Sequence, residues 1–536
     1  MLGATNGSST SVWMDTAAVP VFPPLAGDLE AGVCVIGAGI AGLTTAWLLA
    51  QEGLDVVVID ALGIGAGETG RSTAHFFPPD EWYGGIEHRF GAAQARLVAG
   101  SYAHALALVE GIVRREQIDC GFERLDGYLV GAYAPRADGM VADSTAARLQ
   151  HEVDAAVRAG VAAELLPAVP GLDAQSGPCV RYPGQAQFQP LQYLAGLARA
   201  FSARGGRIYG ATHAHRVRGD HRRQVVATDR GDIRARAVVV ATHTPFNDRV
   251  VMHTKQAGYR TYVVGLRLPR AGVPRLLLWD LGDPYRYVRL TQDGAGNDVL
   301  LVGGADHKTG QDGHPAHCYD ELERWARARF PMALEVAWRW SGEVMEPSDG
   351  LPFLGRNPMD DENVYLITGD SGNGMTHCTI GAMLVTDLIM ERPNPWSALY
   401  DPARKPVHGF REFAGEQANV MARYGEWLAG GEVDSVHAIA PGEGAVLRDG
   451  LRRIAVYRDP QGALHALSAR CTHLGCAVHW NGAERSWDCP CHASRFDTEG
   501  KVLHGPAPTA LAKVDLPADA APPPRERRSG ARRGVR

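Results

Sequence analysis

Two short segments near the end of the chain each place a cysteine close to a histidine. The first reads CTHLGC over residues 471–476, and the second reads CPCHAS over residues 489–494. Each segment offers one thiolate and one imidazole. Fifteen residues separate His473 from Cys489, which is enough for a hairpin that brings the two segments together. These side chains constrain the fold of the last part of the chain more than any other feature.

The four residues form a ligand set for a Rieske [2Fe-2S] cluster. In such a cluster two thiolates bind one iron and two neutral imidazoles bind the other, which raises the reduction potential over that of an all-cysteine cluster. Zinc also accepts two cysteines and two histidines, but a zinc site would leave Cys476 and Cys491 without a role. The sequence therefore predicts a Rieske cluster. Its predicted ligands are Cys471, His473, Cys489 and His492.

This region resembles the Rieske proteins of respiratory and photosynthetic cytochrome complexes. The resemblance implies a disulfide between Cys476 and Cys491, and residues 505–508 resemble the loop that covers the cluster in those proteins. Ser494 lies where they donate a hydroxyl hydrogen bond to a bridging sulfide, whereas Phe496 replaces their usual tyrosine. Loss of an O–H donor destabilises the reduced cluster. We therefore expect a lower potential than in those relatives.

The N-terminal part carries a dinucleotide-binding pattern. A short apolar strand precedes GAGIAG, a helical segment follows to Ala50, and a second strand ends at Asp60. The glycines allow a tight turn, close approach of the backbone to a pyrophosphate and close helix packing, while the helix N-terminus attracts phosphate. Asp60 is placed to bind ribose hydroxyls. The predicted contact residues are Gly37, Gly39, Ile40, Ala41, Gly42 and Asp60.

Residues 30–405 resemble the D-amino-acid oxidase/glycine oxidase superfamily. The resemblance rests on GIGAGETGRSTAHF (63–76), GQAQFQPLQYLAGL (184–197), DGLPFLG (349–355) and GDSGNGMT (369–376). It implies FAD, with late glycines whose N–H groups favour negative charge on the reduced flavin. The FAD contacts that it implies are Arg71, Ser72, Thr73, Ala241, Thr242, Gly369, Gly372, Gly374, Met375 and Thr376.

His75 has two open interpretations. Residues 72–75 have the same Ser-Thr-x-His spacing as dimethylglycine and sarcosine dehydrogenases, in which the histidine is covalently bonded to the flavin. The surrounding residues differ. His75 is therefore either a covalent attachment point or a packing and hydrogen-bonding residue near the cofactor.

The predicted architecture is an α/β Rossmann-like FAD-binding domain with an inserted α+β substrate domain, followed by an all-β Rieske domain. We expect the leader to lie over the surface and the tail to be disordered and basic. The predicted parts are a leader (1–31), an oxidoreductase (32–408), a linker helix (409–431), a Rieske domain (432–518) and a tail (519–536). The FAD-binding parts are 32–80, 180–245 and 342–408, and the substrate parts are 81–179 and 246–341.

Composition narrows the cellular setting. The chain has 536 residues and a net charge of −6, and its basic residues are interleaved with acidic ones. This distribution excludes a nucleic-acid-binding surface. The N-terminus lacks the basic and apolar regions of a signal peptide, and we expect no membrane span. A cytoplasmic protein is predicted.

The two cofactors together suggest amine or amino-acid oxidation. Hydride would pass from a carbon beside nitrogen to FAD, and the cluster would pass single electrons to an external acceptor such as a ferredoxin, cytochrome or quinone. The combination resembles bacterial FAD-dependent amine and amino-acid oxidoreductases with a C-terminal Rieske domain. In this interpretation Arg260 pairs with a substrate carboxylate. The candidate pocket residues are Tyr259, Arg260, Tyr287, Trp340 and His377.

Other functions fit less well. A Rieske oxygenase needs a mononuclear iron held by two histidines and a carboxylate in a domain after the cluster, but only about forty residues follow His492. A respiratory subunit would carry a membrane helix before the cluster. A non-catalytic electron carrier or redox sensor is the alternative from another functional class.

Overall fold

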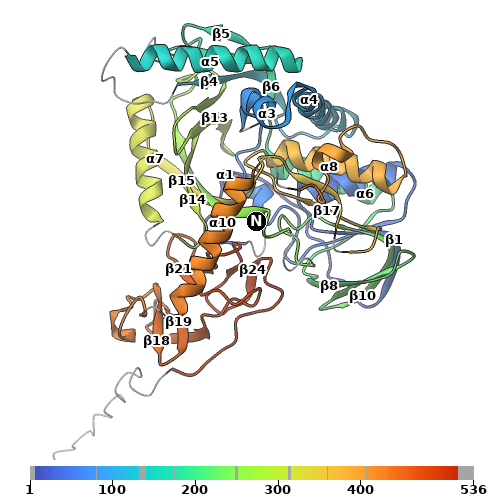
Figure 1. Cartoon of the computed structure of the whole chain (residues 1–536), viewed down its shortest axis with the longest axis vertical. Coiled ribbons are helices and arrows are strands. Elements are labelled where there is room, and N and C mark those ends of the chain that lie inside the picture. The colour runs from blue at the N-terminus through green and yellow to red at the C-terminus, as the bar shows by residue number, and fades with distance from the viewer. Residues whose placement is uncertain are drawn as a thin grey trace, which may run out of the picture.

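A computed structural model of the chain supplies the fold (Figure 1). It describes residues 6–79, 81–131, 140–172, 176–247, 252–311, 315–358, 360–405, 409–428 and 430–516. The predicted basic tail lies outside these residues. Three bodies are visible in Figure 1: two layered α/β regions above and a smaller β region below, which helix α10 (Phe410–Tyr424) connects to them.

The FAD-binding region is built on a largely parallel sheet. At its centre, β1 (Leu29–Ile36) pairs in parallel with β2 (Val56–Ile59) and β10 (Gly231–Val240). Helices α2 (Ile40–Gln51) and α8 (Gly374–Ile389) pack against each other beside it. The remaining strands of this sheet are β7 (Arg207–Tyr209), β8 (Ala214–Gly219), β9 (Gln224–Thr228), β16 (Phe353–Arg356) and β17 (Val364–Thr368).

A nine-stranded sheet forms the substrate region. Its long strands β11 (Gln256–Arg267) and β15 (Val336–Pro347) run antiparallel, and β14 (Asp298–Lys308) pairs with the other edge of β11. Helix α7 (Ala316–Arg329) packs on β11 and β14. The other strands are β3 (His75–Phe76), β4 (Glu123–Val130), β5 (Glu164–Leu166), β6 (Cys179–Gln187), β12 (Leu277–Asp280) and β13 (Arg286–Gln292).

One helix has the length and apolar composition of a membrane span. This helix is α4 (Ala92–Arg115), but 44% of its most apolar window is buried within the protein. It packs against α3 (Trp82–Phe90), α5 (Met140–Ala159) and α8. Its apolar face therefore serves as part of the core. The other helices are α6 (Pro190–Ala203) and α9 (Ser397–Tyr400).

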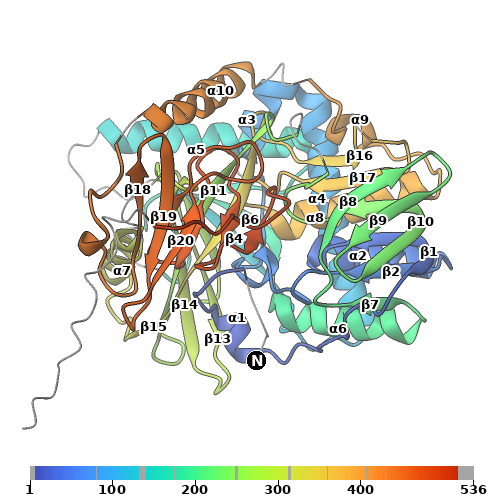
Figure 2. The same ribbon diagram turned by 90° about the horizontal axis from the view of Figure 1, so that it is seen from below.

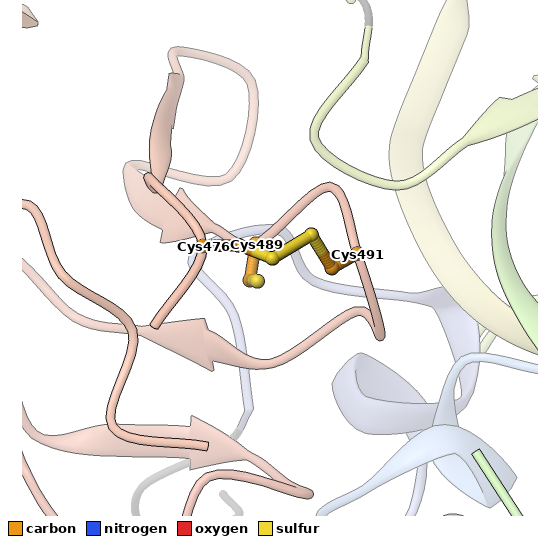
Figure 3. Close-up of side chains that lie close together, drawn as sticks. All are labelled: Cys476, Cys489 and Cys491. Atoms are coloured by element: carbon orange, nitrogen blue, oxygen red, sulfur yellow. A yellow bond between two sulfur atoms is a disulfide. The ribbon is translucent and has the colours of Figure 1, made fainter. Parts of the chain in front are cut away.

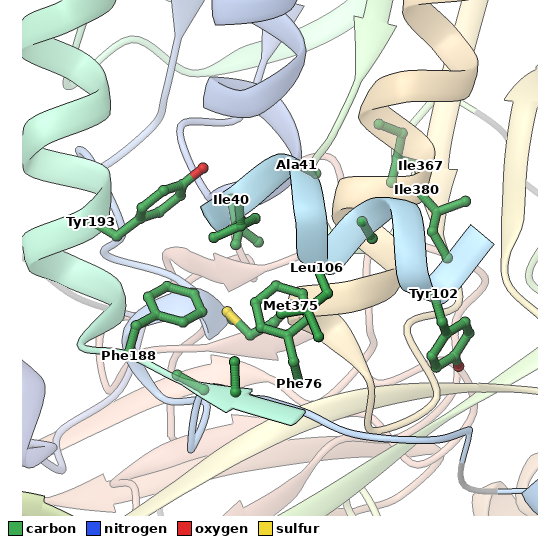
Figure 4. Packing of buried hydrophobic residues seen from close by; sticks show 14 of the residues in the cluster. Ile40, Ala41, Phe76, Tyr102, Leu106, Phe188, Tyr193, Ile367, Met375 and Ile380 are labelled. Atoms are coloured by element: carbon green, nitrogen blue, oxygen red, sulfur yellow. The ribbon is translucent and has the colours of Figure 1, made fainter. Parts of the chain in front are cut away.

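The core between the two sheets lies against the start of α2 and of α8. Figure 4 shows Ile40 and Met375, which lie in the first turns of these helices, among Phe76, Phe188 and other apolar side chains. Ile40 and Met375 are each 2% exposed. Burial of this many large apolar groups is the main favourable contribution to the stability of the region. It also fixes where the two helix N-termini point.

The C-terminal domain is all-β, as predicted. Its first sheet contains β18 (Gly444–Asp449), β19 (Arg452–Arg458) and β20 (Leu464–Ser468). Its second contains β21 (His479–Asn481), β22 (Ser486–Asp488), β23 (Arg495–Phe496) and β24 (Val502–His504). The preceding helical segment contacts it, because Tyr424 Oη and Trp427 Nε1 donate hydrogen bonds to the carbonyls of Leu474 and Gly475.

The expectation that the leader lies over the surface is wrong. Residues Val12–Thr16 form helix α1, and Trp13 is fully buried. The Trp13 indole donates a hydrogen bond to the Ser72 carbonyl at 2.6 Å. In Figure 2, α1 lies beneath the junction of the two larger sheets. A polar, proline-containing sequence does not reveal that a single buried tryptophan will anchor it.

A buried network of charges joins the leader, both oxidoreductase regions and the Rieske domain. Glu484 of the Rieske domain accepts hydrogen bonds from Ser9 and Ser341 and lies 3.4 Å from Arg71 Nη1. Arg260 Nη2 lies 3.8 Å from the same carboxylate. Burial alone would raise the pKa of Glu484, but the guanidinium groups of Arg71, Arg260 and Arg495 lower it to about 2. The Rieske domain is therefore held by a charge that stays ionised.

We predict that Glu484→Gln loosens this junction. The neutral amide leaves two buried guanidinium groups with less compensation, which costs about 3–5 kcal/mol when a buried pair is broken. Guanidinium denaturation followed by tryptophan fluorescence measures the loss. Glu499→Gln, an exposed change beside Lys501 on the same domain, should change stability little. Equal denaturation curves for Glu484→Gln and the wild type would contradict the role given to this network.

Candidate functional site

The predicted dinucleotide-binding turn has the required backbone geometry. Gly37 has a φ of +110°, and a Cβ on Gly42 would lie 1.9 Å from the Gly37 carbonyl oxygen. Only glycine allows this approach of helix α2 to the strand. Asp60 directly follows β2 and accepts backbone hydrogen bonds from Ala38, Leu62 and Gly63, each at 2.8 Å. Its carboxylate thus organises the turn, and Asp60 also lines the first of the two cavities described next.

Two adjoining cavities follow this turn. They share the lining residues Ile40, Glu68, Thr69, His243, Asp370 and Cys378. The first collects the predicted residues Gly37, Gly39, Ala41, Asp60, Ala241 and Thr242. The second collects the predicted residues Arg71, Ser72, Thr73, His75, Gly372, Gly374 and Met375. Segments separated by more than 300 residues thus line one continuous path suited to an extended dinucleotide.

Three predicted residues support this path without lining either cavity. Gly42 packs against β1, and Gly369 has a φ of +78° in the turn after β17. Thr376 is buried in the first turn of α8. Their contribution is to position the backbone that does border the cavities.

The second cavity has a strongly aromatic wall. Trp279 stacks on Phe77 with ring centroids 3.3 Å apart, and the His75 ring lies 4.7 Å from Trp279 and 5.9 Å from Tyr287. Tyr285 completes the wall. Aromatic faces attract organic cations and pack against apolar chains. Of these residues, only His75 and Tyr287 were identified from the sequence, because Phe77, Trp279 and Tyr285 belong to no motif.

A hydrogen-bonded route leads away from this wall. The Thr261 and Tyr287 hydroxyls lie 2.9 Å apart, and Asp306 hydrogen-bonds to Thr261 and Tyr285. Burial raises the pKa of Asp306 to about 6. The side chain can therefore take or release a proton near neutral pH. Nothing in the local sequence around Asp306 distinguishes it from an ordinary surface aspartate.

The other candidate pocket residues lie elsewhere. Arg260 and Trp340 are fully buried and line neither cavity. Arg260 donates to Ser341 Oγ, and the Trp340 indole donates to the Arg71 carbonyl. The Arg260 side chain thus serves the buried charge network, in place of the substrate carboxylate expected from the sequence.

Tyr259 and His377 also have structural partners. Tyr259 hydrogen-bonds to Glu416 of the linker helix and lies outside both cavities. His377 borders the first cavity, and its Nε2 lies 2.6 Å from Tyr102 Oη. Burial lowers the pKa of His377 to about 4. It is therefore a neutral residue within the core beside the cofactor path.

Arg71 differs from its expected role at the pyrophosphate. Its guanidinium donates to Asn6, to Ser9 and to the Ser341 carbonyl, and it approaches Glu484. The Ser/Thr residues that follow it do line the second cavity. These partners of the Arg71 guanidinium lie in the leader, on β15 and in the Rieske domain, although the residue also lines the second cavity.

The cluster ligands come together as predicted. The Cys471 and Cys489 thiols are buried and not in disulfides, and hydrogen bonding to Cys489 lowers the pKa of Cys471. The rings of His473 and His492 lie 4.9 Å apart. His492 Nδ1 is buried with no hydrogen-bond partner among the described residues. Two thiols and two adjacent imidazoles fit a [2Fe-2S] cluster.

The predicted disulfide is confirmed. Cys476 and Cys491 are bonded, and Figure 3 shows the bridge beside Cys489. The bridge joins the two loops that carry the ligands. Ser494 is fully buried, and its Oγ accepts a hydrogen bond from the Ala507 N–H. The loop over residues 505–508 is thereby tied to the second ligand segment.

The histidine side of the cluster site faces the oxidoreductase. His253 is 3% exposed, and its ring lies 4.7 Å from His473 and 5.9 Å from His492. Residues Val502–Gly505, Ala507 and Pro508 of the Rieske domain line the first cofactor cavity. The two cofactor sites are therefore neighbours within one chain.

Residues 32–388 match the model of the FAD dependent oxidoreductase family. The chain belongs to this family. Residues 427–515 match the model of the Rieske [2Fe-2S] domain. The chain thus binds FAD through its oxidoreductase domain and a [2Fe-2S] cluster through its Rieske domain.

Relatives share both parts or the first alone. The Rieske 2Fe-2S iron-sulfur protein YhfW of Bacillus subtilis is 32% identical over 94% of this chain and 97% of its own. Gamma-glutamylputrescine oxidoreductase of Escherichia coli is 26% identical over 73% of this chain and 91% of its own. The structure of glycine oxidase from Geobacillus kaustophilus superposes with a TM-score of 0.59 at 21% identity, over 70% of this chain and 99% of that one. The predicted glycine-oxidase-like fold is confirmed.

We predict that Phe496→Tyr raises the midpoint potential of the cluster. Phe496 is fully buried among the cluster-binding cysteines, and a new hydroxyl donor there would stabilise the more negative reduced state. One net hydrogen bond of about 1 kcal/mol corresponds to about 40 mV for one electron. An EPR-monitored redox titration measures the change. Tyr457→Phe is the matched control, because that hydroxyl accepts from Arg485; an unchanged potential in Phe496→Tyr would contradict the argument.

Proposed function

We propose that this chain oxidises a C–N bond of a small amine or amino acid by hydride transfer to FAD. The electrons would then leave singly through the Rieske cluster to an external acceptor. The observation that carries the proposal is the adjacency of the two cofactor sites, because Rieske-domain residues line the FAD cavity itself. FAD supplies a two-electron acceptor and the cluster supplies a one-electron carrier.

The aromatic cavity supports an amine as substrate. Phe77, Trp279 and Tyr287 present ring faces and edges to the space beside the predicted flavin-contacting residues. Such a wall attracts an ammonium group and packs against its alkyl chain. Positioning of the reacting carbon is the main catalytic contribution expected of these residues. Gamma-glutamylputrescine, which the name of one relative contains, is an amine of this kind.

A substrate ammonium must lose a proton before its carbon can donate hydride. The Thr261 and Tyr287 hydroxyls reach from the cavity toward Asp306. Because the pKa of Asp306 is raised to about 6 by burial, its carboxylate can accept that proton at neutral pH. We propose that Asp306 is the proton acceptor and that the two hydroxyls carry the proton to it.

Coverage of the cluster histidines supports an internal electron route. The His253 side of the oxidoreductase packs against both ligand histidines. In this proposal electrons enter the cluster from the oxidoreductase through this contact. An external acceptor would then collect them from a different side of the Rieske domain. Its identity, a ferredoxin, cytochrome or quinone, is left to experiment.

An anaerobic substrate screen tests the proposal. Amines, polyamine derivatives and N-methylated amino acids are mixed with the holoenzyme, and flavin absorbance near 450 nm and the EPR signal of the reduced cluster are followed together. We expect one class of amine to bleach the flavin and then produce the cluster signal. A flavin that no amine reduces would favour an electron carrier or redox sensor. Flavin reduction without cluster reduction would refute the internal route.

We predict that Trp279→Leu weakens amine binding. Loss of a desolvated cation–π contact of about 1–2 kcal/mol should raise KM by about 5- to 30-fold and change FAD content little. Steady-state kinetics with an artificial acceptor measures the change. Trp325→Leu, a change on helix α7 outside both cavities, is the control. Equal effects of the two substitutions would show that the loss is not specific to the cavity.

A further inference from the structure

Three side chains from distant parts of the chain converge where the cofactor cavities adjoin: His243 lines both cavities, Glu343 lines the second and His504 lines the first. His243 follows β10 of the FAD-binding sheet, Glu343 lies on β15 of the substrate region, and His504 ends β24 of the Rieske domain. One nitrogen or oxygen from each lies within 4.8 Å of those from the other two. Glu343 is 2% exposed and His504 is 8% exposed. This group of three residues was not predicted from the sequence, because its first and last members are 261 positions apart.

Each of these three side chains has a buried polar atom without a hydrogen-bond partner among the described residues. His243 Nε2, Glu343 Oε1 and His504 Nε2 are buried and have no hydrogen-bond partner among the described residues. Glu343 Oε1 and His504 Nε2 lie 3.1 Å apart, but not in hydrogen-bond geometry. Buried polar atoms without partners are costly and call for a ligand, a water or an ion. These three residues each place a ligand atom within 4.8 Å of the other two, so one shared ion could serve all of them.

The backbone and a neighbouring carboxylate orient His243 for this role. His243 has a φ of +65°, a left-handed conformation that a non-glycine residue adopts at a cost. Its Nδ1 lies 3.8 Å from Asp370 Oδ1, on the side of the ring away from Nε2. Histidines that bind metals usually present the second ring nitrogen to a carboxylate or carbonyl, which fixes the tautomer. The Asp370 carboxylate lies within ion-pair range of that nitrogen but beyond hydrogen-bond distance.

The proposed ligands lie within the buried charge network. This network contains the carboxyls of Glu68, Glu343, Glu484 and Asp488 and the guanidinium groups of Arg71, Arg260 and Arg495. A cation bound to Glu343 would therefore lie beside further carboxyl groups, as a buried charge requires.

We propose that His243, Glu343 and His504 bind one divalent transition-metal ion, additional to the two irons of the cluster. Two imidazoles and a carboxylate suit borderline cations such as Zn²⁺ and Fe²⁺, and three protein ligands leave a position open for water or another small ligand. Arg260 lies 3.8 Å from the second oxygen of Glu343. That oxygen stays paired while the first one faces the metal.

The proposed ion would join three regions. No single domain contains the ligand set, since the Rieske domain supplies only His504. The site therefore exists only while the Rieske domain is docked against the cofactor cavities. Metal binding would stabilise that docked arrangement, because a ligand stabilises the state that binds it. This inference goes beyond the proposed amine oxidation and does not depend on it.

Elemental analysis of the full chain tests the site. FAD-loaded, cluster-loaded protein is incubated with Zn²⁺, desalted and analysed for iron and zinc per chain. We expect two irons and one zinc; an as-purified third iron that zinc displaces would identify Fe²⁺ as the resident ion. Glu343→Gln and His504→Asn should each weaken Zn²⁺ binding by at least about 100-fold. His465→Asn, on β20 of the same domain and remote from the ligands, should bind zinc as the wild type does.

Zinc-edge X-ray absorption of the wild type decides the ligand set even if a buried substitution prevents folding. The expected spectrum shows two imidazoles and oxygen ligands near 2.0–2.1 Å. Sulfur scattering near 2.3 Å would place the zinc at cysteines and overturn the proposal. It is also overturned if FAD-loaded protein binds no third metal, or if both ligand variants retain it. None of these measurements depends on amine turnover, so failure of the catalytic proposal would leave them interpretable.

Discussion

The contact on which the rest of the structure depends is the buried charge network around Glu484. One Rieske carboxylate meets Arg71 and Arg260 from two different regions, and Ser9 of the leader completes its hydrogen bonds. Ions buried in this way are stable only as a satisfied set, because each unpaired member would carry a large desolvation cost. The network therefore positions the Rieske domain against the oxidoreductase as one assembly.

That positioning determines what surrounds the cluster site. In the docked arrangement the ligand histidines face His253, and the loop after β24 enters the lining of the FAD cavity. A cluster whose histidine side is covered by its own oxidoreductase is suited to receive electrons there. The aromatic wall around Trp279 and the buried Asp306 occupy the opposite part of the path. In the proposed function, substrate oxidation and electron exit would therefore take place in different parts of the path.

Several arginines and acids near the cofactor sites form ion pairs and hydrogen bonds between domains. Arg71 and Arg260 were expected to bind pyrophosphate and substrate, and both instead hold the domain junction. Glu343 is left beside the imidazoles of His243 and His504, and its Oε1 has no hydrogen-bond partner among the described residues. Buried polar atoms without hydrogen-bond partners therefore lie between the two cofactor sites. A metal ion bound there would join the regions.

The sequence by itself determined the cofactors. The cluster ligands and the disulfide lie within a 22-residue stretch, and the glycines of the FAD turn act through their local backbone, so short segments sufficed to predict them. The strand, helix and strand around the GAGIAG turn followed from hydrophobic periodicity. Only the tertiary structure decided that Trp13 is buried, that Arg71 and Arg260 face the Rieske domain, and that Trp279 and Phe77 form a cavity wall. These outcomes depend on partners hundreds of residues away, which local pattern does not encode.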